Sequence, residues 1–169
     1  MVYGDLLAHM VPDARKALGF GLGVILIILI LTVGSLPGAL SLFLPVIFSL
    51  LWLLGTMKWL HLKINPFNLV ALPFTAAYAT IHALHFYHRY EEEGRGTLPL
   101  VFRRTGRSAV VASVVAAAAF VPMIFTGHRG LASLGVSAVL GLAFALIAPV
   151  LFVGGVLGLW EAGRIRKDR

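Results

Sequence analysis

Residues 64–93 read INPFNLVALPFTAAYATIHALHFYHRYEEE, and this stretch decides the fold. It is an apolar run that carries three histidines within seven residues, His82, His85 and His88, and it ends in three consecutive glutamates. A helix that crosses about 30 Å of hydrocarbon needs about 20 apolar residues. An ionisable side chain inside such a helix is costly, so it usually faces protein or water and serves a function. The stretch therefore predicts a membrane-spanning helix with candidate functional histidines.

The composition of the whole chain supports the same fold class. Of its 169 residues, 59% are hydrophobic and 12% are charged, whereas a soluble domain has about half and about a quarter. Backbone groups find no water in lipid, so spanning segments must be helical. We therefore expect an all-α integral membrane protein. The net charge of +7 does not indicate nucleic-acid binding, because the basic residues lie in short gaps between apolar runs.

Five apolar segments are long enough to form the spans of one transmembrane domain over residues 17–160. They are residues 17–33, 38–59, 67–87, 108–125 and 131–160. The first run exceeds the apolar core of a signal peptide, which has about 7–15 residues, so it is interpreted as a span. Residues 1–16 are expected to form an external lead-in helix, and residues 161–169 a basic cytoplasmic tail.

The distribution of lysine and arginine predicts the orientation of these spans. Five of the basic residues fall on the side of the N-terminus and nine on the side of the C-terminus. Because positive residues are retained in the cytoplasm, we expect the N-terminus outside and the C-terminus in the cytoplasm. Residues 91–107 then form a cytoplasmic loop. This loop is either a short amphipathic segment on the inner leaflet or a solvated basic connection that only sets the topology.

Six short motifs, in a consistent order and spacing, resemble the RND (resistance-nodulation-division) superfamily, and most of all its MMPL-type and hopanoid or lipid exporters. They are Gly34–Leu40, Asn68–Pro73, His88–Glu92, Arg104–Ser108, Phe120 and His128–Gly135. A half-transporter of this family has one span, a large external domain and then five further spans. The resemblance implies that this chain corresponds to those C-terminal five spans. It also implies a location in the bacterial cytoplasmic (inner) membrane.

The function implied by the resemblance is proton-linked export of lipids or other hydrophobic molecules, together with a second transporter half or as a homo-oligomer. No cofactor and no enzymatic activity are expected. Members of the family usually carry an aspartate shortly before an Ile-His pair, but residues 76–82 read AAYATIH and contain no acid. Two other functions stay open. One is a non-transporting structural or lipid- or sterol-sensing module, and the other is a histidine-rich, metal-dependent membrane enzyme.

The candidates for a proton or substrate pathway are Tyr78, Thr80, His82, His85 and Ser113. His82 and His85 share one helix face, and histidine titrates near neutral pH, so it can pass protons where water reaches it. The alternative is that both histidines are neutral and hydrogen-bonded to the backbone, or to Ser113 and Thr80 at a helix interface.

Histidines at steps of three drift around a helix, so three ligands to one metal would be strained, and no metal site is expected. Small residues at a spacing of four let membrane helices approach closely. Such pairs occur at Gly19 and Gly23 and at Gly154 and Gly158. They predict either a moving helix interface or ordinary tight packing.

Overall fold

The computed structural model describes the backbone of residues 2–94 and 96–165 and the side chains of residues 13–94 and 96–159. Within these residues the chain is entirely helical, which agrees with the fold class expected from the sequence. The helices are α1 (Val2–Val33), α2 (Leu36–Trp59), α3 (Pro66–Leu69), α4 (Ala71–Glu93), α5 (Leu98–Ile124) and α6 (Arg129–Ile165).

Five segments of the described chain are long and apolar enough to cross a membrane, as the sequence predicts. They are Asp13–Val33, Leu36–Trp59, Pro66–Glu93, Leu98–Ile124 and Arg129–Leu159. The third joins the single turn of α3 to α4 through Val70. The α1 helix continues through its span toward the N-terminus without a break, so its backbone is helical over the expected lead-in region.

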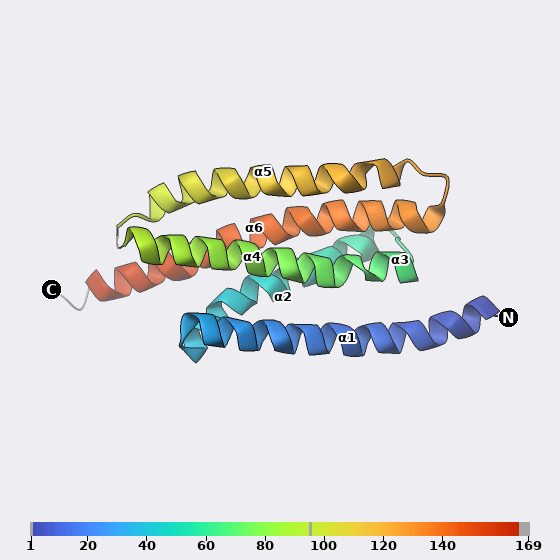
Figure 1. The fold of residues 1–169 in the computed structure, drawn as a ribbon, viewed down its shortest axis with the longest axis horizontal. Coiled ribbons are helices and arrows are strands. Elements are labelled where there is room, and N and C mark those ends of the chain that lie inside the picture. Colours follow the sequence, from blue (N-terminus) through green and yellow to red (C-terminus); the bar gives the residue numbers. More distant parts are fainter. Residues whose placement is uncertain (1, 95, 166–169) are drawn as a thin grey trace.

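The helices form an elongated bundle in which α6 packs against α2, α4 and α5 (Figure 1). The α1 helix lies at the edge of the bundle, mainly against α2. The two ends of the chain lie at opposite ends of the bundle, as an odd number of crossings requires. We call the end with the α1–α2 and α4–α5 connections the Gly94 end. The opposite end, with the α2–α3 and α5–α6 connections, is called the Asn65 end.

The centre of the bundle is built from small and branched apolar side chains. Ala76, Ala79 and Ala83 of α4 are fully or almost fully buried, as are Ala145 and Ala148 of α6. Small residues at a helix interface allow backbones to approach closely, which replaces the missing hydrophobic driving force between helices in lipid. This close packing fixes α4 between α2 and α6 and leaves another face of α4 toward α5.

The segment expected as a loop at residues 91–107 has a different structure. The α4 helix extends to Glu93 and α5 already begins at Leu98, so only a short connection separates them. Val101 is completely buried, and the ring of Phe102 stacks on Phe86 at 4.9 Å. The apolar face of this segment therefore packs on the protein core, so a solvated loop does not describe residues 98–107. A position at the inner leaflet stays a prediction.

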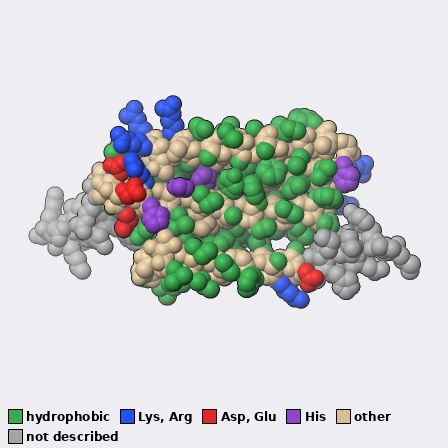
Figure 2. All heavy atoms as spheres, viewed as in Figure 1, with side chains coloured by type: hydrophobic (Ala, Val, Ile, Leu, Met, Phe, Trp, Pro, Cys, Tyr) green, Lys and Arg blue, Asp and Glu red, His purple; other side chains and the backbone are tan. Residues whose placement is uncertain are grey.

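Charged side chains gather at the two ends of the bundle, and hydrophobic side chains cover its middle (Figure 2). Exposed aliphatic side chains include Ile27 and Leu31 of α1 and Val111, Val114 and Val115 of α5. A band of this kind is the surface expected to meet lipid acyl chains.

Candidate functional site

The buried histidine of α4 forms the centre of the candidate site. His82 is 3% exposed, and its Nε2 atom lies 3.0 Å from Oγ of Ser113 on α5, in a hydrogen bond whose direction depends on the histidine tautomer. Ser113 is itself buried. Among the side chains that the structure describes, His82 is the only buried histidine and no Lys, Arg, Asp or Glu is buried. The bundle thus encloses one basic ring with a single hydroxyl partner.

Aromatic rings continue from His82 toward the Asn65 end. The half-buried ring of Tyr78 lies 6.1 Å from the His82 ring, one turn away on α4. Phe74 follows at 4.7 Å from Tyr78, and it meets Phe120 of α5 at 5.2 Å. These side chains form a mixed aromatic and polar row along the α4–α5 interface, which places Tyr78 within one turn of the His82–Ser113 pair.

Two of the candidates from the sequence, Thr80 and His85, do not contact the His82–Ser113 pair through a hydrogen bond in the described structure. The Thr80 hydroxyl donates to the carbonyl of Ala76 in its own helix, at 2.8 Å, so its donor is used there. His85 is exposed at the surface, one turn from His82 toward the Gly94 end. The structure therefore places Tyr78 and Ser113 beside the buried His82 ring, uses the Thr80 hydroxyl within its own helix, and leaves His85 at the surface one turn from His82.

A surface cleft of about 390 Å³ lies between α4 and α5 near the Gly94 end. We call it the α4–α5 cleft. It is lined by His85, His88, Arg89, Glu92, Arg104, Thr105 and Ser108. Its lining consists entirely of polar or ionisable residues, unlike the apolar middle of the bundle.

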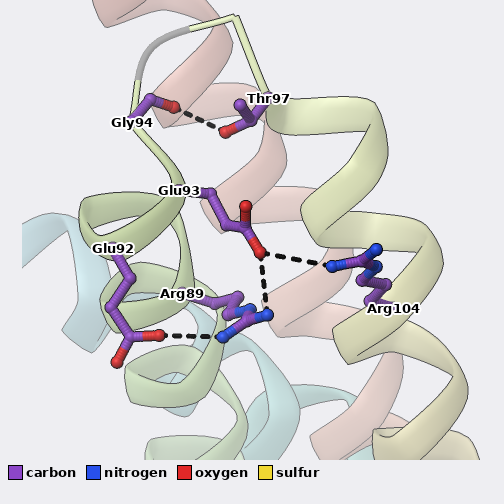
Figure 3. A network of polar contacts seen from close by, with 6 residues as sticks. All are labelled: Arg89, Glu92, Glu93, Gly94, Thr97 and Arg104. Atoms are coloured by element: carbon purple, nitrogen blue, oxygen red, sulfur yellow. Dashed lines mark hydrogen bonds and ion pairs between the residues drawn. The ribbon is translucent and has the colours of Figure 1, made fainter.

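Ion pairs border this cleft (Figure 3). Arg89 forms ion pairs with Glu92 at 3.0 Å and with Glu93 at 2.7 Å, three and four residues further along α4. Arg104 of α5 lies 3.6 Å from the same Glu93 carboxylate. The connection is closed by Thr97, whose hydroxyl donates to the carbonyl of Gly94. The network joins the end of α4 to the start of α5.

The predicted packing glycines behave differently from one another. A Cβ atom added at Gly154 would lie 2.7 Å from Cζ of Phe102, so this glycine admits a close contact between α6 and α5. A Cβ at Gly19, Gly23 or Gly158 would meet no atom within 4 Å in the described part of the chain. Within these described residues, no three histidine or carboxylate side chains are grouped so that they could hold a metal ion.

Polar contacts that the sequence reasoning missed hold the central helices together. The buried hydroxyl of Ser49 on α2 lies 2.7 Å from the carbonyl of Pro45 and 3.1 Å from the carbonyl of Phe144 on α6. Proline lacks a backbone N–H, but its carbonyl can still accept a hydrogen bond, as Pro45 does here. The Ser49 side chain thus links α2 to α6. The only hint of this link in the sequence is a serine one helical turn after Pro45, within an apolar span.

At the Asn65 end, side-chain amides fix the short helix α3. The Asn65 side chain caps α3 by accepting from the amides of Phe67 and Asn68, and it donates to Oγ of Ser133 on α6 at 2.6 Å. Asn68 is 1% exposed, and its amide donates to the carbonyl of Lys63. The start of the third span is therefore tied to α6.

Comparisons with protein-family models, with curated proteins and with solved structures give no match to this chain. The resemblance to the RND superfamily therefore rests on the sequence motifs.

Proposed function

We propose that this chain is the membrane portion of an RND-type exporter of lipids or other hydrophobic molecules. In this proposal it lies in a bacterial inner membrane with its N-terminus outside, and it works with a second transporter half or with further copies of itself. Protonation of His82 drives movement at the α4–α5 interface.

The observation that carries the proposal is the buried hydrogen bond between His82 and Ser113. When Nε2 is an acceptor, protonation converts it to a donor and places a charge in an apolar bundle. Such a charge is costly unless water or a polar partner reaches it. Ser113 can turn its hydroxyl to accept, but it cannot supply a compensating negative charge. Separation of α5 from α4, which admits water, is the direct way to stabilise the protonated state.

The packing of the bundle supports a separation of α5 from α4. The α5 helix contacts α6 more extensively than it contacts α4, and α4 is in turn held by α2 and α6. Displacement at the α4–α5 interface therefore breaks fewer contacts than displacement of α4 from the centre. The spans contain no aspartate at the position that the resemblance implies. Among the titratable candidates in the third span, His82 is the buried histidine, so we assign the coupling to it.

The experiment uses the full chain in liposomes with a fluorescent phospholipid as cargo and an imposed pH gradient. We expect gradient-dependent movement of the lipid between leaflets, measured by its accessibility to an impermeant quencher. His82→Phe keeps an aromatic ring but cannot titrate, and it should abolish the gradient dependence. The matched control is His61→Phe, at an exposed histidine in the α2–α3 connection. Equal gradient dependence in wild type and His82→Phe would remove His82 from the mechanism.

If the wild-type chain moves no cargo under any gradient, export by this chain alone is contradicted. Reconstitution with a second transporter half would then decide between a component that needs its partner and a module that does not transport.

A further inference from the structure

The α4–α5 cleft has the composition of an anion site, and the mechanism proposed for His82 does not use it. Beside the carboxylate of Glu92, which is paired with Arg89, it offers guanidinium, imidazole and hydroxyl groups from two helices within about 390 Å³. We propose that this cleft binds the phosphate group of an anionic ligand, and that the ligand is a phospholipid whose headgroup lies at the membrane surface. This inference does not depend on export.

Arg104 is the residue expected to hold the phosphate. Its side chain is 62% exposed, and Nη1 is 3.6 Å from Glu93. That separation exceeds the distance of about 2.7–2.9 Å at which charge-assisted hydrogen bonds form. By contrast, both terminal nitrogens of Arg89 are engaged by Glu92 and Glu93 at 3.0 and 2.7 Å. Arg89 is therefore fixed in place, and Arg104 keeps donors that can turn toward a ligand.

Imidazole and hydroxyl donors complete the lining. His85 and His88 are exposed, and an imidazole carries at least one N–H in either tautomer. The Ser108 hydroxyl donates to the carbonyl of Thr105 at 2.9 Å, and rotation about its C–O bond would redirect it into the cleft. A phosphate oxygen can accept from several such donors at once.

The charges at this end of the bundle favour an anion that approaches from the membrane surface. Glu92 and Glu93 balance Arg89 and Arg104 in the ion-pair network, so the ligand must compete with Glu93 for Arg104. The exposed side chains of Arg103 and Arg107 lie on the same part of α5 but outside the cleft lining. They raise the local potential, which concentrates anions near the surface.

The surface next to the cleft favours a lipid over free phosphate. On α4, Ile81 lies one turn from His85 on the same face, and it is 47% exposed. On α5, Val111 and Val115 continue the face of Arg104 and Ser108, and they are 57% and 66% exposed. A polar cleft that leads into an exposed apolar strip toward the middle of the bundle matches a headgroup with its attached acyl chain.

The test measures lipid binding by native mass spectrometry of the purified full chain, with phosphatidylglycerol and phosphatidylcholine of matched acyl chains. We expect preferential binding of phosphatidylglycerol. Arg104→Gln should weaken this binding about tenfold, the effect expected when a hydrogen bond to a charged group is lost. The matched control is Arg103→Gln, which removes the same charge from the neighbouring position, and it should change binding much less. Equal losses in the two variants would show that only the general surface charge matters, and would overturn the proposed site.

Ser108→Phe provides a second variant that leaves all charges in place. Because Ser108 is exposed, the substitution fills the cleft without disturbing the core, and we expect it to lower phosphatidylglycerol binding as Arg104→Gln does. Unchanged binding in Ser108→Phe would exclude the cleft. Competition with inorganic phosphate distinguishes a lipid headgroup from free phosphate as the ligand. Displacement at low millimolar phosphate would overturn the lipid as ligand while leaving the phosphate site, whereas resistance to displacement supports the lipid.

Discussion

The hydroxyl of Thr75 on α4 faces Gly141 on α6 so closely that a Cβ atom at position 141 would overlap it. The same Cβ would lie 3.4 Å from Cδ2 of Leu53 on α2. Thr75 is fully buried, and its hydroxyl is held by the carbonyl of Ala71 at 2.7 Å, so it cannot turn away without breaking that bond. Three helices thus meet at one glycine, which joins α2, α4 and α6 closely, whereas α5 contacts α6 extensively and α4 much less.

Substitution Gly141→Ala should destabilise the bundle by about 1–3 kcal/mol, because extra volume in a well-packed interface forces neighbouring groups to shift. The thermal unfolding midpoint in detergent, followed by tryptophan fluorescence, measures the effect. Gly155→Ala on the same helix is the control, since a Cβ there would meet no atom within 4 Å in the described chain. A midpoint lowered equally in both variants would contradict the close contact with Thr75.

Neither Gly141 nor Thr75 was among the residues that the sequence indicated for helix packing. Glycine spacing selects residues that share a face of one helix, but it does not say which face meets another helix. A Cβ at Gly154 would touch Phe102, whereas a Cβ at Gly19, Gly23 or Gly158 would meet no atom within 4 Å among the described residues. The five spans were predictable because hydropathy is a local property of each segment. The early start of α5 was not, since burial of Val101 depends on its contacts with distant helices.

Substitution Ser113→Ala should cost about 1–3 kcal/mol of stability, because it leaves Nε2 of the buried His82 without its hydrogen-bond partner. The measurement is again the thermal midpoint, compared among the wild type, the single variants Ser113→Ala and His82→Phe, and the double variant. We expect the serine substitution to matter much less once the imidazole is gone. Thr32→Ala is the control, since that hydroxyl is exposed and bonds its own helix. Additive effects of the two substitutions would rule out the pairing.

The pairing of His82 with Ser113 was one of two interpretations that the sequence allowed. Residue type alone identified both members, since few polar residues occur in these spans. Residue type could not exclude Thr80 and His85, because the sequence does not say which face of α4 packs against α5.

Substitution Asn65→Ala should destabilise the Asn65 end by about 1 kcal/mol or more, the usual cost of a lost N-cap, with the bond to Ser133 lost in addition. Hydrogen exchange of the α3 amides should increase, because Phe67 and Asn68 lose their acceptor. Ser35→Ala is the matched control. Ser35 occupies the N-cap of α2 but makes no side-chain capping bond. Unaltered exchange in α3 would show that the cap does not hold this helix in the membrane.

The absence of native cysteines permits a direct test of the crossing pattern. Single cysteines are introduced at the exposed positions Ser35, Leu60, Glu91 and Gly127, and intact cells are treated with an impermeant maleimide. We expect labelling at Leu60 and Gly127 but not at Ser35 and Glu91. The first two lie at the Asn65 end of the bundle and the others at the Gly94 end, whose basic residues should remain in the cytoplasm. Labelling of only Ser35 and Glu91 would reverse the orientation while keeping the five crossings. Labelling of Ser35 together with Gly127 would contradict the crossings themselves, because the α1–α2 and α5–α6 connections lie at opposite ends of the bundle.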